Sequence, residues 1–342
     1  MTAATARLGR PWKKLSITIE GIIDIKDIGE NMKVVVIGSG LMGSAIAARS
    51  ALAGNPTVLV DLSEENAKKG IASALVCIDE LVENELASSD QQKHAVDNLT
   101  WSCDNAQAVQ GADLVIEAIV ENISAKQKLF ESLDALLPEN VPILSNTSGL
   151  RITDIAAKVT RYPERTMTAH FWFPAHLVPL VEVVMWDKTD ARLAEYVRDI
   201  LASWGKAPVI VKRDLPGQLA NRMLQAIIRE AVNTVSIGLA SPEDVDTAIK
   251  MGMGIRLPVW GILEHIDGVG LDLATSVQDT VLPELSCIQE AAPLLREMVS
   301  KGDLGYKTGK GLYDWNVKDM DKLARKRNAF IIQALKTMEK YD

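Results

Sequence analysis

A glycine-rich turn near the start of the chain constrains the fold more than any other feature. The sequence Gly38-Ser39-Gly40-Leu41-Met42-Gly43 stands between an apolar run, residues 34–37, and an alanine-rich stretch, residues 45–53. In such a strand–turn–helix unit, the first glycine permits the tight turn and the second lets backbone amides approach a pyrophosphate. The third glycine allows close packing of helix on strand. Because a helix amino terminus attracts anions, the pattern predicts a dinucleotide site formed by Gly38, Gly40, Leu41, Met42 and Gly43.

An aspartate marks the end of the next apolar run. Residues 58–60 are apolar, and Asp61 follows them directly. A carboxylate at this point accepts hydrogen bonds from the adenosine ribose hydroxyls and repels a ribose 2′-phosphate. The strand before the turn, the helix after it and the acid at the second strand therefore predict NAD, rather than NADP, as the cofactor.

Composition and charge exclude several other classes of protein. A hydrophobic content of 47% with 24% charged residues is typical of a globular protein with a real core. The net charge of −8 argues against nucleic acid or an anionic membrane as the partner. No apolar run approaches the roughly 18 residues of a membrane span. We therefore expect a small-molecule substrate and no membrane association.

The cysteines indicate the redox compartment. Cys77, Cys103 and Cys287 are widely spaced and form neither a CxxC motif nor a cluster with histidines. This spacing predicts no disulfide framework and no metal site. We expect buried or incidental thiols in a reducing environment, and hence a cytoplasmic protein.

The pattern of elements predicts two domains after an N-terminal extension, residues 1–31. Strand and helix patterns alternate through residues 32–213, which is the signature of a Rossmann-type α/β domain with a parallel sheet covered on both faces. Residues 214–342 have an almost wholly helical pattern, which predicts an all-α C-terminal domain. In the extension, Glu20 and Asp24 interrupt the apolar stretch 15–25, which argues against a signal peptide, whereas the acid-free first 19 residues resemble a transit peptide.

The predicted elements follow from apolar periodicity and capping residues. Strands are expected at residues 34–37, 58–60, 113–118, 142–145, 167–171, 180–184 and 208–211, and helices at residues 45–53, 63–85, 89–96, 125–136, 153–159, 191–204, 219–236 and 318–340.

A histidine and a glutamate on successive predicted strands form the candidate catalytic pair. His170 is one of four histidines and ends the strand 167–171, while Glu182 lies in the strand 180–184. Neighbouring strands can place the two side chains together. A buried glutamate that accepts a hydrogen bond from one imidazole nitrogen orients the ring and favours its protonated form. This arrangement suits a general base that removes a hydroxyl proton while a hydride leaves for nicotinamide.

At this point the chain resembles a known family, the L-3-hydroxyacyl-CoA dehydrogenases and their relatives acting on small 3-hydroxy acids. The resemblance covers residues 32 to about 315. It rests on the glycine turn and on five further segments in the same order: Glu117-Ala118-Ile119-Val120-Glu121-Asn122, Ser145-Asn146-Thr147-Ser148, His170 through Val183, Pro216-Gly217 to Asn221-Arg222, and Lys307-Thr308-Gly309-Lys310-Gly311-Leu312-Tyr313. It implies an NAD-binding domain, an all-helical dimerisation domain and a homodimer. The implied reaction is reversible NAD-linked oxidation of a 3-hydroxyl to a 3-keto group.

The resemblance also implies roles for single residues. His170 resembles the general base and Glu182 its orienting partner, while Ser148 and Asn221 resemble the groups that hold the reacting oxygen and the neighbouring carbonyl. Each of these residues also has a purely structural alternative. Ser148 could cap the following helix, and Asn221 could be a polar residue at a helix start. His170 and Glu182 could be a structural buried pair.

Two more residues are implied on the cofactor side. Glu121 and Lys126 resemble cofactor contacts at the end of the fourth strand, although Lys126 could equally be a solvated surface charge.

Several departures from the family pattern bear on the substrate. The usual His-Phe-Phe-Asn-Pro is His170-Phe171-Trp172-Phe173-Pro174 here, so Phe173 replaces an asparagine near the nicotinamide. Pro179 stands where the acyl-CoA branch has a lysine, as in the branch that oxidises free hydroxy acids such as L-gulonate and carnitine. Arg256 resembles an arginine of that branch and could clamp a carboxylate, or could form a surface ion pair. His176 could line the pocket or face solvent.

The sequence leaves four hypotheses for the function. The leading one is an NAD-dependent dehydrogenase of free 3-hydroxy acids, with Arg256 and Phe173 as substrate contacts. The alternative is oxidation of the CoA thioester, which the long helical stretch after Asp61 favours. More remote are a β-hydroxyacid dehydrogenase that uses a lysine, and a crystallin-like protein that binds NAD without turnover.

Overall fold

The computed structural model describes residues 31–338, so the extension predicted at residues 1–31 lies almost wholly outside the described residues. The chain divides into two compact units: the first ends at Leu219, and the second spans Ala220–Tyr341. The division falls a few residues after the position at which the sequence pattern becomes helical. Among the described residues, no helix is both long and apolar enough to span a membrane.

An eight-stranded sheet forms the centre of the first unit, in the order β3-β2-β1-β4-β5-β6-β7-β8. The strands β1 to β6 run parallel, β7 runs antiparallel to β6, and β8 is parallel to β7. Their bounds are β1 Val34–Ile37, β2 Thr57–Val60, β3 Leu99–Ser102, β4 Leu114–Glu117, β5 Ile143–Ser145, β6 Thr166–Phe171, β7 Leu180–Val184 and β8 Ala207–Val211.

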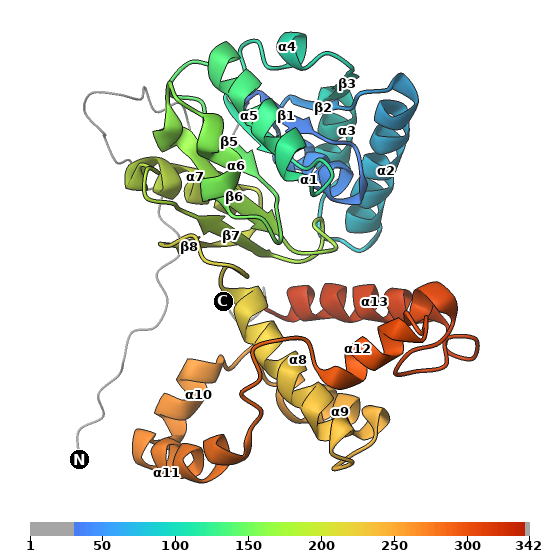
Figure 1. Ribbon diagram of the computed structural model, residues 1–342. Helices are drawn as coiled ribbons and strands as arrows, with labels where there is room; N and C mark the ends of the chain where they lie inside the picture. The colour runs from blue at the N-terminus through green and yellow to red at the C-terminus, as the bar shows by residue number, and fades with distance from the viewer. Residues whose placement is uncertain (1–30, 339–342) are drawn as a thin grey trace, which may run out of the picture. The chain divides into compact units, whose positions relative to one another are not determined.

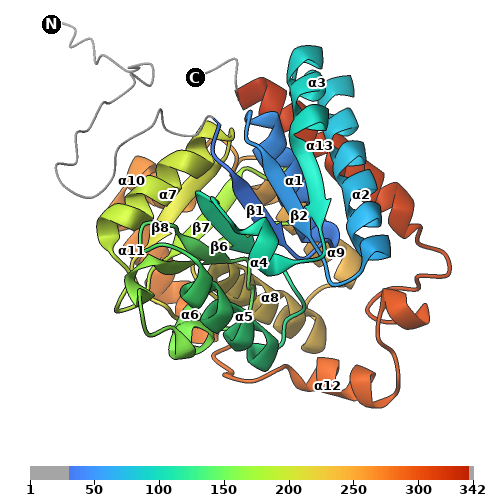
Figure 2. The ribbon, with the colours of Figure 1, turned by 90° about the horizontal axis from the view of Figure 1, so that it is seen from above.

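Helices cover both faces of this sheet. Figure 2 shows α1 and α7 on one side of the strands, and α5 and α6 on the other. Polar residues cap several of these helices, as Ser63 does when its side chain accepts a hydrogen bond from the amide of Asn66. The α-helices of this unit are α1 Leu41–Leu52, α2 Glu64–Glu83, α3 Ser89–Asn98, α4 Asn105–Ala108, α5 Ile123–Leu136, α6 Ile152–Ile155 and α7 Ala191–Ser203.

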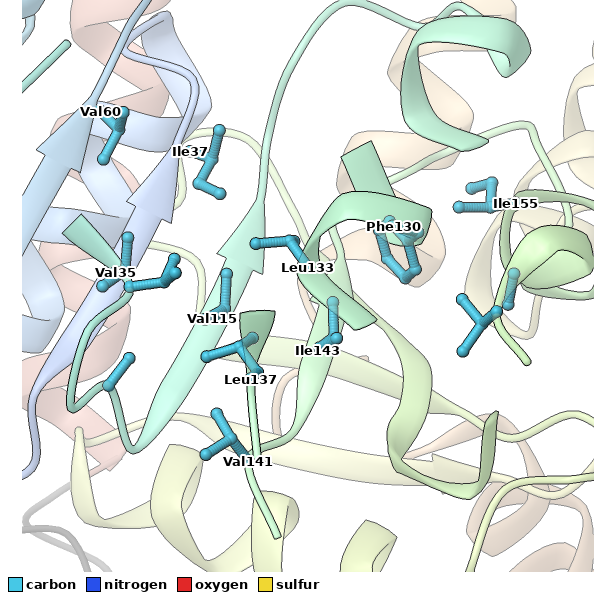
Figure 3. Packing of buried hydrophobic residues seen from close by; sticks show 14 of the residues in the cluster. Val35, Ile37, Val60, Val115, Phe130, Leu133, Leu137, Val141, Ile143 and Ile155 are labelled. Atoms are coloured by element: carbon cyan, nitrogen blue, oxygen red, sulfur yellow. The ribbon is translucent and has the colours of Figure 1, made fainter. Parts of the chain in front are cut away.

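Burial on both faces explains why the central strands read as continuous apolar runs. On one face, Phe130 and Leu133 of α5 pack over Val115 of β4 and Ile143 of β5, and all four side chains are fully buried (Figure 3). This packing fixes the carboxyl ends of the central strands, which is where parallel α/β sheets bind their ligands.

The described part of the second unit is built from helices joined by turns (Figure 1). They are α8 Ala220–Ser236, α9 Pro242–Ala248, α10 Ile262–Val269, α11 Leu271–Val281, α12 Pro293–Ser300 and α13 Met320–Met338, with a π-helical turn at Ile249–Gly254. The Rossmann-type α/β domain followed by an all-α domain is thus confirmed.

The structure corrects two expectations. The sheet is not wholly parallel, because the connection from Phe171 to Leu180 is too short for a crossover and forces β7 to run antiparallel. The strand β3 was not predicted. Only Leu99 of this strand is buried, so no apolar run marks it in the sequence. The three cysteines are free, and Cys77 is partly buried while Cys103 and Cys287 are exposed, as incidental thiols can be.

Candidate active site

The glycine turn between β1 and α1 requires glycine at two of its positions. Gly38 has a φ of +110°, and a Cβ atom there would lie 2.5 Å from the carbonyl oxygen of Ala118. A Cβ atom on Gly43 would lie 1.8 Å from the carbonyl oxygen of Gly38. A side chain on Gly38 would push the turn away from the residue after β4, and one on Gly43 would collide with the backbone of the turn itself, so both positions require glycine.

The middle glycine faces open space instead. A Cβ atom built on Gly40 would meet no atom within 4 Å, and the Leu41 side chain is 75% exposed. Within the described residues, no side chain caps the amino terminus of α1. The start of α1 therefore has the open backbone and the uncapped amides that a diphosphate needs, and it fits a dinucleotide. The individual contacts of Gly38, Gly40, Leu41, Met42 and Gly43 with a cofactor stay predictions.

Asp61 lies directly after β2 and is held from several sides. Its Oδ2 accepts hydrogen bonds from the Ser39 hydroxyl at 2.6 Å and from the Ser39 amide at 3.2 Å. Its Oδ1 accepts from the Asn66 side-chain amide at 3.3 Å and from the Ser63 amide at 3.4 Å. Partial burial raises the pKa of Asp61, but these hydrogen bonds outweigh it and bring the pKa below its usual value. The carboxylate is thus ionised and fixed beside the glycine turn.

The structure brings His170 and Glu182 together. The antiparallel register of β6 and β7 pairs the two residues directly, and the His170 Nδ1 lies 2.8 Å from the Glu182 Oε2. Glu182 is fully buried, and its other carboxylate oxygen accepts a hydrogen bond from the Leu219 amide at 2.9 Å. An ionised carboxylate can only accept, so the Nδ1 carries the proton of this contact.

Ser148 completes the arrangement on the other side of the ring. Its hydroxyl lies 3.1 Å from the His170 Nε2. In the neutral imidazole with its proton on Nδ1, Nε2 is an acceptor, so the serine donates to it. Ser148 does not cap the following helix, because α6 begins after Arg151. The plainer reading of Ser148 as a helix cap is therefore wrong.

Glu121 fixes the turn that carries Ser148. Its Oε1 lies within hydrogen-bonding distance of the amides of Ser148, Gly149 and Leu150, at 3.2, 3.0 and 3.4 Å. The Thr147 hydroxyl donates to the same oxygen at 2.5 Å. Desolvation raises the pKa of Glu121, but the hydrogen bond from Thr147 and the charge of Lys126 together lower it below its usual value. An ionised glutamate therefore organises the backbone beside His170.

Lys126 is a buried cation, so the reading of a solvated surface charge is wrong. Its side chain is 1% exposed, and its Nζ lies 2.6 Å from the Glu117 Oε1 and 3.0 Å from the Glu121 Oε2. Glu117 is fully buried and also accepts a hydrogen bond from the Ser145 hydroxyl at 2.6 Å. Lys126 thus links the end of β4 to the turn of Ser148, and its direct contact with a cofactor stays a prediction.

Two predicted residues belong to the second unit. Asn221 lies in the first turn of α8, where its Oδ1 accepts a hydrogen bond from the Gln225 side chain at 3.4 Å. Arg256 is exposed, and its Nε donates to the Gly252 carbonyl at 3.1 Å. Among the described residues the structure records no ion pair for Arg256. Their roles toward the substrate stay predictions.

The hydrogen bond of Trp172 did not follow from the sequence, whereas Phe173 and His176 were already candidates. The indole Nε1 of Trp172 donates to the Glu182 Oε2 at 2.9 Å, while the next residue, Phe173, is 54% exposed. His176 is buried and does not face solvent, because its Nε2 lies 2.6 Å from the Glu80 Oε2. The only sequence signal for Trp172 was its place two residues after the histidine. Among residues 31–338, no group of His, Cys, Asp and Glu side chains could hold a metal ion.

Comparison with known proteins identifies the family. Residues 33–215 match the family described as "3-hydroxyacyl-CoA dehydrogenase, NAD binding domain", and residues 217–315 match its "C-terminal domain". The chain is 38% identical over 289 residues to the mitochondrial hydroxyacyl-coenzyme A dehydrogenase of Sus scrofa, which covers 82% of this chain and 90% of that protein. The lysine-dependent dehydrogenase considered above is therefore not supported.

A second relative has a different substrate. The 5-formyl-3-hydroxy-2-methylpyridine 4-carboxylate 5-dehydrogenase of Mesorhizobium japonicum is 33% identical over 306 residues, with 90% of this chain and 98% of that protein covered. A crystal structure of an enzyme of this activity, described as an NAD+-dependent dismutase, superposes with a TM-score of 0.83 at 33% identity and covers 90% of this chain and 99% of that one. A 3-hydroxybutyryl-CoA dehydrogenase from Ralstonia eutropha gives 0.69 at 33% identity, covering 84% and 99%. The chain belongs to the 3-hydroxyacyl-CoA dehydrogenase family and is an NAD-dependent dehydrogenase that acts on a hydroxyl group.

Proposed function

We propose that this dehydrogenase oxidises the 3-hydroxyl of a compact free 3-hydroxy acid to the 3-keto compound, with His170 as the general base. The observation that carries the proposal is the placement of the imidazole between a buried carboxylate on Nδ1 and the Ser148 hydroxyl on Nε2. A base for a secondary alcohol needs one nitrogen without a proton and a partner that stabilises the cation formed.

The residues act in a defined order. The bound nicotinamide supplies the hydride acceptor. The His170 Nε2 removes the hydroxyl proton, and the Glu182 carboxylate, already within 2.8 Å, stabilises the resulting imidazolium. Ser148 turns its hydroxyl toward the reacting oxygen, which becomes a carbonyl oxygen, and Asn221 holds the neighbouring carboxyl or carbonyl oxygen. The Glu121 hydrogen bonds keep Ser148 in place during the step.

On the cofactor side, the start of α1 receives the diphosphate and Asp61 receives the adenosine ribose. We assign the ion pair of Glu121 and Lys126 to the nicotinamide end of the cofactor. The Glu121 carboxylate also holds the turn that carries Ser148. Hydrogen bonds from Ser39 and Asn66 hold Asp61 before any ligand binds, which reduces the cost of ordering it on binding.

A free carboxylate on the substrate accounts for Arg256 and Pro179. We assign Arg256 to that carboxylate, because a guanidinium forms a bidentate pair with a carboxylate, whereas a thioester carries no charge for it to bind. The relative from Mesorhizobium japonicum is named for a substrate with a free carboxylate, and the crystal structure of that activity gives a higher TM-score than the 3-hydroxybutyryl-CoA dehydrogenase structure. Phe173, 54% exposed, adds an apolar surface for a compact substrate.

The competing proposal is oxidation of a CoA thioester. The identity of 38% to the hydroxyacyl-coenzyme A dehydrogenase of Sus scrofa favours it, as does the full-length helix α2 after Asp61. In either case we propose a homodimer in the cytoplasm. Many large apolar side chains of the second unit are exposed, which suits a subunit contact.

Replacing Asp61 tests the cofactor preference. We expect kcat/KM of the unaltered enzyme to favour NAD+ strongly over NADP+, because the fixed carboxylate would repel a 2′-phosphate. The Asp61→Ala variant should raise KM for NAD+ by about tenfold or more, the effect of losing a hydrogen bond to a charged group. Asp97→Ala, which removes an exposed aspartate of α3, serves as the control. Equal use of both cofactors by the unaltered enzyme would contradict the assignment.

Replacing His170 tests the base. The His170→Gln variant should lower kcat by roughly 10²–10⁴, the usual contribution of a positioned acid or base. The Kd for NAD+, measured by calorimetry, should change little, because His170 acts on the substrate oxygen. His94→Gln removes an exposed histidine of α3 and should leave both values unchanged. A His170→Gln enzyme with full kcat would place the base elsewhere.

A substrate panel separates the free acid from the thioester. We expect kcat/KM for a free 3-hydroxy acid of the panel (3-hydroxybutyrate, L-gulonate, carnitine) to exceed that for 3-hydroxybutyryl-CoA. Arg256→Ala should raise KM for that acid by about tenfold or more and leave KM for the thioester unchanged. Arg296→Ala, at an exposed arginine of α12, is the matched control. If the thioester is preferred and Arg256→Ala leaves turnover of the free acids unchanged, the thioester proposal replaces this one.

A further inference from the structure

Trp172 shares a carboxylate oxygen with the candidate base. It follows the last residue of β6, and its Nε1 donates to the Glu182 Oε2 at 2.9 Å. The same oxygen accepts from the His170 Nδ1 at 2.8 Å. The two rings lie beside each other, with centroids 5.6 Å apart and planes inclined by 55°. An indole and an imidazole therefore compete for one oxygen of one buried carboxylate.

This competition has a direct electrostatic consequence. A carboxylate oxygen that accepts two hydrogen bonds shares its negative charge between two donors, and each donor stabilises the ionised form. The indole proton thus reduces the charge that Glu182 presents to the imidazole. Less charge on Glu182 means less stabilisation of the imidazolium.

Several other groups lie around the His170–Glu182 pair. From β8, the residue opposite Glu182 in the register is Val209, which is apolar. The turn after β5 contributes the Ser148 hydroxyl to His170, and Glu121 lies behind that turn with its own charge compensated by Lys126. The Leu219 amide donates to the other oxygen of Glu182.

We propose that Trp172 is a positioning residue that tunes the His170–Glu182 pair through its indole N–H, and so sets the pH above which the enzyme works. The proposal deepens the function proposed above and rests on His170 as the base. A phenylalanine, which the family pattern has at this place, fills similar space and donates no hydrogen bond. The tryptophan therefore adds a donor that packing alone does not require.

The test is the pH profile of the Trp172→Phe variant. As pH rises, kcat/KM for the hydroxy acid increases to a plateau as the base loses its proton. In Trp172→Phe this rise should move to higher pH by about half a unit to one unit, which makes kcat/KM about three- to tenfold lower on the acidic side. The plateau should stay within about threefold of that of the unaltered enzyme. A purely structural role would lower the plateau and leave the midpoint in place.

Trp186→Phe is the matched control. The Trp186 indole also donates within this sheet, to the Thr166 carbonyl and hydroxyl at 3.2 and 3.0 Å, and makes no recorded contact with Glu182. Its pH profile should coincide with that of the unaltered enzyme. A shift of the same size in Trp186→Phe, or an unchanged or lower midpoint in Trp172→Phe, would overturn the proposal.

A second measurement does not depend on activity. The chain has four histidines, so an NMR titration of their imidazole protons resolves His170 once its signal is assigned from His170→Gln. The Trp172→Phe variant should move the His170 midpoint upward and leave those of the other three in place. If His170→Gln keeps full activity, the proposed base fails, yet this titration still decides whether Trp172 tunes the ring.

An isosteric replacement covers the case in which Trp172→Phe does not fold. Benzothienylalanine at position 172 keeps the size of the indole and has sulfur in place of the N–H. It should raise the midpoint as Trp172→Phe does. A protein with this residue and an unshifted midpoint would show that the N–H has no tuning role.

Discussion

The antiparallel pairing of β6 with β7 is the constraint on which the site depends. It sets His170 opposite Glu182 in the register and buries the carboxylate completely. A buried charge is tolerated only when hydrogen bonds compensate it, and Glu182 receives them from His170, Trp172 and the Leu219 amide. These donors come from β6, from the connection after it and from the segment after β8. The charge that we propose for catalysis therefore also determines how these segments are held.

A second network reaches the same imidazole from the other side. Lys126 is buried between Glu117 and Glu121, and Glu121 in turn holds the three amides of the turn that presents Ser148. Buried ion pairs contribute little net stability but strongly penalise any arrangement that separates them. Here a movement of Ser148 away from β4 would separate the Lys126 ion pairs and would therefore be costly. A buried cation of α5 thus helps to fix a hydroxyl group beside His170.

The sequence predicted those parts of the protein whose determinants are local. The turn at Gly38 and Gly43, the carboxylate of Asp61 and the central apolar strands all followed from short patterns, because each depends on neighbouring residues in the chain. The pairing of His170 with Glu182 could also be predicted, since two consecutive strands with a short connection are usually neighbours.

Other features depend on tertiary placement and could not be read in this way. The strand β3 carries no apolar run, and the burial of Lys126 depends on carboxylates brought to it by β4 and the turn that follows. The hydrogen bonds of Trp172 and of the Leu219 amide to Glu182 join segments far apart in the chain or of no special composition. The type of a residue such as lysine or tryptophan does not show whether it lies on the surface or within a charged network.

The state of the His170 ring tests the central claim most directly. Nitrogen-15 NMR of the histidine-labelled enzyme, at a pH on the plateau of the activity profile, distinguishes the two neutral tautomers by their ring shifts. The account predicts a proton on Nδ1, donated to Glu182, and an unprotonated Nε2 that accepts from Ser148. A neutral ring with its proton on Nε2 would contradict the account. In that tautomer the unprotonated Nδ1 would face the Glu182 carboxylate, and Nε2 could not accept the proton of the substrate.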